Sequence, residues 1–116
     1  LSPPMKTPRK ISIEEISWTV IPEVEYESPE TVLGFSENEP ICQWIRKESE
    51  SSEWAWCCVK VTGKLGDLRS SAFVGGCSYF NESEFRASEI FACLQIEIQA
   101  ALEAKLQRIA NEFFSE

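Results

Sequence analysis

The feature that most constrains the fold is a pair of strand-like runs in the middle of the chain. Residues 54–62 and 68–79 are rich in aromatic and β-branched side chains, and a glycine-containing segment, residues 63–67, separates them. This arrangement is typical of an antiparallel hairpin. Because apolar side chains occupy both alternating sets of the first run, we expect this strand to be central in its sheet or covered on both sides.

The register of the hairpin depends on its turn. If the whole segment 63–67 forms the turn, Thr62 lies opposite Leu68, and Trp56 falls near Val74. A slip of one residue would exchange the two faces. The pair Gly75-Gly76 in the second run indicates a bulge, or a place where another backbone or a bulky ring comes close. A ligand lying against bare backbone is the alternative interpretation.

An edge strand is expected before the hairpin, over residues 16–26. Ile16, Trp18 and Val20 lie on one face of this strand. Pro22 cannot donate to a ladder, which restricts the strand to an edge of the sheet or to a bulge. After Pro22, three glutamates alternate with apolar residues and define a candidate acidic face: Glu23, Glu25 and Glu27.

A loop over residues 28–36 and a short amphipathic helix to about Lys47 are expected between the edge strand and the hairpin. Ser36 or Asn38 suits the N-cap position, and Pro40 is tolerated in the first turn. Apolar residues then recur at helical spacing, with Trp44 among them. We therefore expect Trp44 to anchor this helix in the core.

A long amphipathic helix is expected after the hairpin. Asn81 and Glu84 resemble a capping box, and Ala87-Ser88 marks a second helix start. From there to about Phe113, ~25 residues at ~1.5 Å each give a helix of nearly ~40 Å, which exceeds the ~17–20 Å of a typical strand. One apolar stripe follows the helix: Phe91, Leu94, Ile98, Leu102, Leu106, Ile109 and Phe113.

The last turns of this helix are expected to overhang the small sheet and to leave apolar side chains uncovered. Exposed apolar surface at a helix end usually indicates a partner. We therefore expect an interface between two copies of the chain, formed by Leu106, Ile109, Phe113 and Phe114. The alternative is that the helix end frays or folds back on its own domain.

The charge balance restricts the class of partner. The chain has 19 acidic and 11 basic residues and a formal net charge of −8. Because a negative field repels phosphate backbones, we expect no direct nucleic-acid binding and favour docking on a basic protein. A second interpretation is that the acidic face at Glu23, Glu25 and Glu27 mimics phosphates and inhibits a DNA-binding protein.

Length and sequence context indicate one domain in a cytoplasmic setting. We expect a flexible, proline-rich tail over residues 1–10 and a single domain over residues 11–116. The apolar runs are too short to span a bilayer, and the first ten residues lack the pattern of a secretory signal. The odd number of cysteines, five, then favours reduced thiols in the cytoplasm.

The absence of histidine restricts the available chemistry. The chain contains no histidine, so Ser-His or Cys-His nucleophile pairs and His-ligated metal sites cannot form within it. The segment from Gly63 to Gly66 also lacks the spacing of a phosphate loop. We expect no enzyme activity, no catalytic residues and no cofactor. A metal site formed by four thiolates is conceivable, although the cysteines do not follow a known metal-binding motif. Its ligands would be Cys57, Cys58, Cys77 and Cys93.

A longer pattern runs through the hairpin and its flanks. It reads Trp-Ala-Trp-Cys-Cys-Val-Lys-Val-Thr from Trp54, Gly-Asp-Leu from Gly66, Val-Gly-Gly-Cys-Ser-Tyr from Val74, and then Glu84-Phe85. This pattern resembles a group of small uncharacterised proteins of bacteriophages and other bacterial mobile elements. The resemblance covers about residues 16–102 and departs at Val74, where leucine is usual, and in the longer helical tail. It implies a phage or bacterial cytoplasmic context and an accessory role, and it assigns no functional residue.

These patterns predict an α+β domain in the order β-α-β-β-α, with a small antiparallel sheet covered by a long C-terminal helix. The core is expected to be dominated by Trp18, Trp54, Trp56 and Phe73. The function we expect is that of a non-catalytic accessory or regulatory protein, acting through protein–protein interaction as a homodimer. The alternatives are a small-molecule or metal binding module built on the aromatic and cysteine-rich hairpin, and the acidic nucleic-acid mimic.

Overall fold

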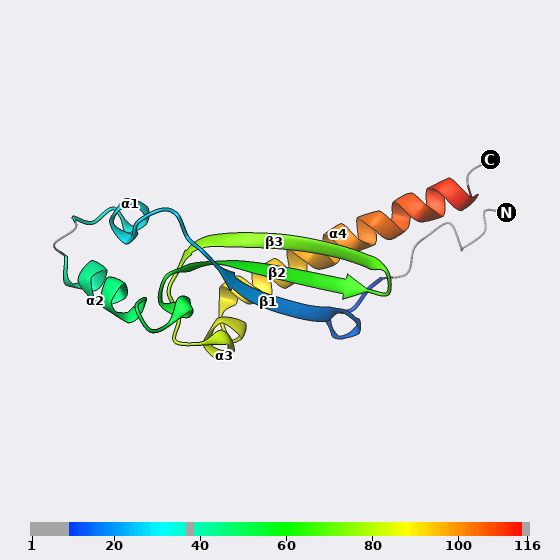
Figure 1. Cartoon of the computed structure of the whole chain (residues 1–116). Coiled ribbons are helices and arrows are strands. Elements are labelled where there is room, and N and C mark those ends of the chain that lie inside the picture. Colours follow the sequence, from blue (N-terminus) through cyan, green and yellow to red (C-terminus); the bar gives the residue numbers. More distant parts are fainter. Residues whose placement is uncertain (1–9, 37–38, 115–116) are drawn as a thin grey trace.

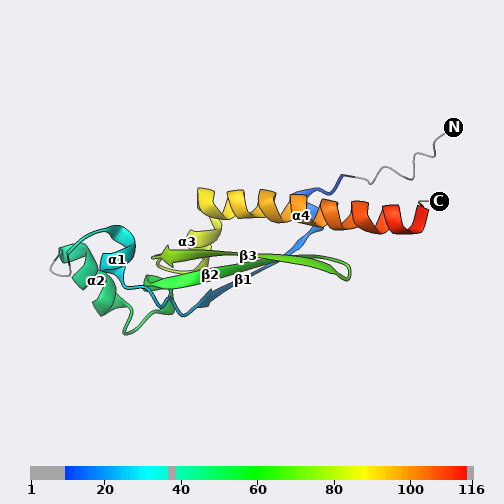
Figure 2. The same cartoon turned by 90° about the horizontal axis from the view of Figure 1, so that it is seen from above.

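A three-stranded antiparallel sheet with one long helix along it forms the centre of the protein. The structure, a computed structural model, describes residues 10–36 and 39–114. The sheet has the order β1 (Ser17–Glu23), β2 (Cys57–Leu65), β3 (Leu68–Cys77), and helix α4 (Glu89–Phe114) lies along one face (Figures 1 and 2). The predicted α+β class is confirmed. Of the predicted tail, residues 1–9 lie outside the described residues.

The strand positions agree with the prediction, but the register of the hairpin does not. As expected, β2 is central and β1, with its proline, is an edge strand. Leu68 pairs with Leu65 rather than Thr62, and Thr62 pairs with Ser71. The turn is therefore only Gly66-Asp67, and Gly66 has a φ of 61°, which glycine adopts without strain.

Gly63, which the prediction placed in the turn, lies inside β2 on the face that α4 covers. A Cβ atom at this position would lie 2.7 Å from Ile98 Cγ2 and 2.9 Å from Trp18 Cζ3. A larger residue would need these side chains to shift. The glycine therefore marks a close contact between helix and sheet rather than a reversal of the chain.

The observed register also changes which side chains reach the core. Phe73 pairs with Lys60 on the side of the sheet away from α4 and is 57% exposed, so its prediction as a core residue was wrong. Trp54 is buried, whereas Trp18 and Trp56 are partly exposed. Of the two alternatives given for β2, the central position applies and coverage on both sides does not, because the face away from α4 is open (Figure 2).

The core lies between α4 and the sheet. Phe85 is fully buried and stacks near Trp54, with ring centroids 5.9 Å apart, and near Tyr79, at 5.2 Å. Burying such a side chain contributes about 2–3 kcal/mol. The remaining buried residues of this layer come from all three strands and from α4: Val20, Cys57, Val59, Val61, Ala72, Cys77, Phe91, Leu94, Ile98 and Leu102.

The glycines Gly75-Gly76 lie where the register shifts near the start of β2, between Cys57 and Val59. A Cβ on Gly75 would lie 2.8 Å from Glu25 Oε1, and one on Gly76 would lie 2.6 Å from a methyl group of Val32. The predicted bulge is therefore confirmed. The groups that come closest are the side chains of Glu25 and Val32, whereas the prediction named another backbone or a bulky ring.

Two helices lie between β1 and β2, where the prediction had a loop and one helix. Helix α1 (Pro29–Leu33) begins after Ser28, whose Oγ caps it, and ends at Gly34, which has a φ of 74°. Helix α2 (Pro40–Glu48) has Glu39 as its N-cap, not Ser36; the other predicted cap, Asn38, lies outside the described residues. A 3₁₀ turn, η3 (Glu53–Ala55), follows and leads into β2.

Trp44 on α2 is 42% exposed, which contradicts its prediction as a core anchor. It meets Phe80 edge-to-face, with ring centroids 6.2 Å apart, and Phe80 is itself 70% exposed. The buried residues of α2 are instead Cys42 and Ile45.

The helical region after β3 is divided as expected. Helix α3 (Glu82–Arg86) is capped by Asn81, whose Oδ1 accepts a hydrogen bond from the backbone N–H of Glu84 at 2.9 Å. The Glu84 carboxylate in return accepts from the backbone N–H of Phe80 at 3.0 Å. Helix α4 then begins at Glu89, just after the predicted second start.

The segment before β1 is held on α4 by its backbone. The N–H of Ile11 donates to Glu103 Oε2 at 2.8 Å, and the carbonyl of Ile11 accepts from Gln99 Nε2. The Ile11 side chain is only 1% exposed. A 3₁₀ turn, η2 (Ile13–Glu15), connects this segment to β1, and Trp18 Nε1 donates to the carbonyl of Ile13 at 3.2 Å.

Candidate functional site

The uncovered end of α4 is the first candidate site. The apolar stripe of the helix is buried as far as Leu102, which is 0% exposed. Leu106 is half-buried, Ile109 is 37% exposed and Phe113 is 76% exposed. Figure 2 shows the cause, because α4 continues past the turn between β2 and β3. The predicted overhang is confirmed for Ile109 and Phe113, whereas the side chain of Phe114 lies outside the described residues.

Charges of both signs flank this end of the helix. Lys105 Nζ donates to the backbone carbonyl of Arg69 and so holds α4 to β3. Arg108 and Glu112 lie one turn apart on the exposed stretch. A hollow of about 320 Å³ lies between the hairpin tip and the helix, lined by Leu68, Lys105, Arg108, Ile109 and Glu112.

The three glutamates of the predicted acidic face have different surroundings. Glu23 ends β1 and is exposed. Glu25 Oε1 accepts a hydrogen bond from the N–H of Gly76 at 2.5 Å, and its Oε2 accepts from the N–H of Glu27 at 3.1 Å. The carbonyl of Glu27 accepts from Trp56 Nε1 at 2.8 Å. The carboxylate of Glu25 therefore holds this segment against β3.

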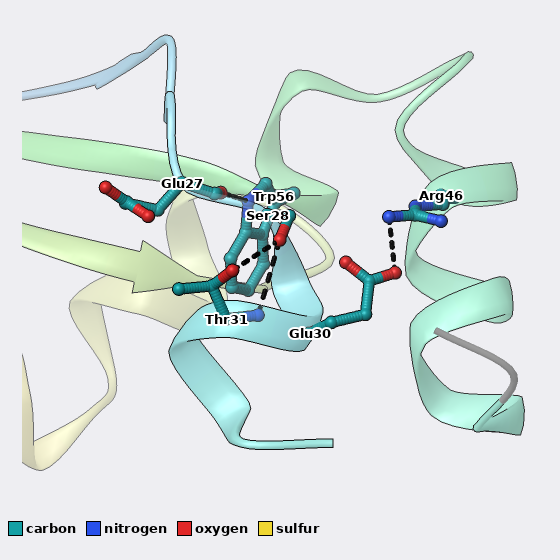
Figure 3. A network of polar contacts seen from close by, with 6 residues as sticks. All are labelled: Glu27, Ser28, Glu30, Thr31, Arg46 and Trp56. Atoms are coloured by element: carbon teal, nitrogen blue, oxygen red, sulfur yellow. Dashed lines mark hydrogen bonds and ion pairs between the residues drawn. The ribbon is translucent and has the colours of Figure 1, made fainter. Parts of the chain in front are cut away.

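A polar network fixes α1 and α2 at the end of the sheet (Figure 3). Ser28 Oγ accepts a hydrogen bond from the backbone N–H three residues later at 3.3 Å, which caps α1. Glu30 of α1 forms an ion pair with Arg46 of α2. The indole of Trp56 reaches across from the start of β2 to the backbone before α1. These contacts position the two short helices relative to the strands.

A cleft of about 430 Å³ lies beside Trp56 at the end of β1, and three carboxylates contribute to its lining: Glu23, Glu25 and Glu53. Its volume lies in the usual range for small-molecule sites. The sequence did not indicate this cleft, because Glu53 is far from the other two glutamates along the chain.

The cysteines are distributed over different parts of the fold. Cys57 and Cys77 lie directly opposite each other on β2 and β3, buried under α4. Cys58 points to the other side of the sheet, Cys93 is exposed on α4, and Cys42 is buried on α2. The four cysteines of the predicted thiolate site therefore do not meet at one place in the fold. Over residues 10–36 and 39–114, no group of three or more Cys, Asp and Glu side chains could hold a metal ion.

The environment of the two opposed thiols keeps them protonated. Burial is the largest cause that raises the pKa of Cys57 to about 12 and of Cys77 to about 11. A neighbouring cysteine adds to each shift, Cys77 in the case of Cys57 and Cys58 in the case of Cys77. Because the thiolate is the nucleophile and the metal ligand, these two residues are poorly suited to either role at neutral pH.

The open face of the sheet, the side away from α4, was not predicted from the sequence. It carries these residues of the three strands: Ser17, Thr19, Ile21, Glu23, Cys58, Lys60, Thr62, Lys64, Arg69, Ser71, Phe73 and Gly75. The alternation of Lys60, Thr62 and Lys64 with buried valines was a signal for this face. It was obscured because the same alternating set also contains Trp56 and Cys58.

Comparisons with protein-family models, curated proteins and solved structures found no match to this chain. In the part of the chain that the structure describes, no helix has both the length and the apolar character of a membrane span. The arrangement of its strands and helices places the chain in the α+β class, with a three-stranded antiparallel sheet and a long C-terminal helix.

Proposed function

We propose that this protein is a non-catalytic accessory or regulatory protein that acts through protein–protein interaction, as a homodimer joined through the end of α4. The observation that carries the proposal is the exposure of Ile109 and Phe113 on a stripe whose earlier members are buried. Burying apolar surface contributes about 25 cal/mol per Å², so covering these side chains with a partner is favourable.

The charges of this segment suit a second copy of the chain. Two α4 ends that pair antiparallel about a twofold axis bring residue i of one copy to residue j of the other, and the reverse. With the axis near Ala110, Arg108 of each copy faces Glu112 of its partner. Leu106 of each copy then lies near the Phe113 of the other. Two ion pairs thus accompany the apolar contact.

The setting we propose is the cytoplasm of a bacterium or an infected bacterial cell. The resemblance of the hairpin pattern to proteins of phages and mobile elements supports this setting. The lack of histidine in the chain supports a non-catalytic role. The acidic nucleic-acid mimic has less support, because the carboxylate of Glu25 is engaged by the backbone N–H of Gly76.

A charge exchange at the interface tests the homodimer. Arg108→Glu and Glu112→Arg each place two like-charged pairs across the twofold axis, whereas the double variant restores two opposite pairs. We expect sedimentation equilibrium to show weaker dimers for each single variant, by about tenfold for a loss of about 1.4 kcal/mol. The double variant should recover the wild-type dissociation constant.

The control for Arg108→Glu is Lys47→Glu, which makes the same change in net charge on the exposed surface of α2. It should sediment like the wild type. A wild-type protein that stays monomeric at every concentration would contradict the proposal, as would a double variant that is weaker than both single variants.

A further inference from the structure

The open face of the sheet differs in charge from the chain as a whole. Acidic residues outnumber basic ones by 19 to 11 in the sequence. Within the three strands, however, this face carries Lys60, Lys64 and Arg69 and one carboxylate, Glu23. The carboxylate of Glu25 also reaches this face, at the end beside Gly75. Among the described residues, none of these three cations takes part in an ion pair. The two carboxylates lie at the Cys58 end, so the face is locally positive from Lys60 towards the hairpin turn, on a protein that is negatively charged as a whole.

Apolar side chains share this face with the cations. Ile21, Lys60 and Phe73 form one row across the three strands, and Ile21 and Phe73 are 44% and 57% exposed. Lys60 Nζ lies 5.8 Å from the centre of the Phe73 ring, which places the ammonium beside the aromatic surface.

A second basic row lies further along the hairpin. Lys64 of β2 pairs with Arg69 of β3, and both side chains are exposed. At ~3.4 Å per residue, this row is roughly 14 Å from Lys60. Hydroxyl groups separate the two rows, where Thr62 Oγ1 and Ser71 Oγ lie 2.8 Å apart.

We propose that the open face docks a segment of a partner protein that carries carboxylates and an apolar side chain. The apolar side chain contacts Ile21 and Phe73, with one carboxylate at Lys60. A second carboxylate, about four residues away in an extended segment, lies between Lys64 and Arg69. Complementary charge selects the partner and speeds its association, while the apolar contact adds the desolvated centre that such interfaces need.

The overall charge favours this occupant over a nucleic acid. The net charge of −8 repels a polymer with a phosphate at every nucleotide, even where a local basic patch is present. A short acidic segment presents only as many charges as the face can match. Figure 2 shows α4 on the opposite side of the sheet, so docking here does not depend on the proposed dimer and extends the function beyond it.

The test is an NMR titration of the ¹⁵N-labelled full chain with a designed serine-based peptide. The peptide carries a leucine, a glutamate two residues from it on the same face of the extended chain, and a second glutamate about four residues beyond the first, to match the two rows. A peptide with glutamine in place of both glutamates and an oligothymidylate are titrated in parallel. We expect the acidic peptide to shift amide signals of β1, β2 and β3 at the open face, and to bind more weakly as salt is raised.

Two charge-reversal variants locate the binding site. Lys64→Glu/Arg69→Glu should raise the dissociation constant of the acidic peptide by about tenfold or more. Lys10→Glu/Lys47→Glu changes the net charge equally at exposed positions away from this face and should have little effect. Both double variants should sediment like the wild type, whereas Arg108→Glu should alter sedimentation and leave the peptide titration unchanged.

Several results would overturn the proposal. One is the absence of shifts at saturating acidic peptide, and another is equal binding of the glutamine peptide, which would reduce the face to an apolar contact. Tighter binding of oligothymidylate, lost in Lys64→Glu/Arg69→Glu, would instead identify a nucleic-acid surface. Equal weakening by both double variants would show a response to net charge alone.

Discussion

Replacement of Gly63 by alanine tests how closely α4 approaches the sheet. The added Cβ would lie 2.7 Å from Ile98 Cγ2, 2.9 Å from Trp18 Cζ3 and 3.0 Å from Ile16 Cγ2. These atoms belong to packed side chains on α4, on β1 and just before β1, so relief requires several of them to move. Overpacking of this kind costs about 1–3 kcal/mol. We expect Gly63→Ala to lower the free energy of unfolding by an amount in this range. The unfolded chain has less conformational entropy with alanine than with glycine, and this difference offsets about 0.5–1 kcal/mol of the loss.

Ile98→Ala provides the second arm of a double-mutant cycle. Ile98 is 1% exposed, and its truncation alone should cost about 2–5 kcal/mol. In the double variant, the methyl group at position 63 enters the space that Ile98 Cγ2 vacates. We therefore expect the double variant to be more stable than the sum of the two single losses predicts, by about 0.5–3 kcal/mol.

Urea unfolding followed by tryptophan fluorescence measures these differences. The protein concentration is kept the same for all variants, because the stability of a dimer depends on it. Lys64→Ala, at the exposed neighbour of Gly63, serves as the control and should change stability by no more than about 0.5 kcal/mol. A Gly63→Ala variant as stable as the wild type, or strictly additive losses in the cycle, would show that this contact is not tight.

Three further predictions concern the hairpin and its surroundings. The folded protein keeps the thiols of Cys57 and Cys77 protonated, with pKa values of about 12 and about 11, while the unfolded chain loses these protons above pH about 9. The free energy of unfolding should therefore fall as the pH rises from about 9 towards 11, and less steeply in Cys77→Ala. In the native protein, a thiol reagent should label exposed Cys93 well before Cys57 and Cys77. Trp56→Phe, which removes the hydrogen bond to the carbonyl of Glu27, should cost about 0.5–1.5 kcal/mol in urea unfolding and make the segment before α1 more sensitive to protease.

Local patterns predicted the elements whose signals do not depend on distant contacts. Pro22 placed β1 at an edge because a missing N–H is tolerated only there. Asn81 placed the start of α3, since a side-chain cap acts within its own turn. The uncovered end of α4 followed from length alone, because a helix of this size exceeds the strands beside it.

The errors arose where tertiary packing decided the outcome. Gly63 was interpreted as part of a turn, although its lack of a side chain serves the contact with Ile98 of α4. That choice shifted the register and turned Phe73 towards the core. Helix α1 was missed for a different reason: five residues are too few to show a helical period, although Ser28 and Gly34 cap it locally.

The open face was not found for a related reason. Its charge becomes apparent only when Arg69 of β3 is brought beside Lys64 of β2, which requires the correct register. In the sequence these two cations are separated by a turn and are masked by an acidic composition. Surfaces built from several strands are thus less predictable than the strands that form them.

The attachment of Ile11 to α4 makes the fold a noncovalent ring, since its hydrogen bonds join residues 88 and 92 positions apart. The segment before β1 cannot separate from α4 without breaking the hydrogen bonds of Ile11 with Gln99 and Glu103. The middle of α4 likewise cannot lift from the strands without freeing Ile11. Amide hydrogens at both places should therefore exchange with solvent in one shared opening event rather than by fraying from the ends.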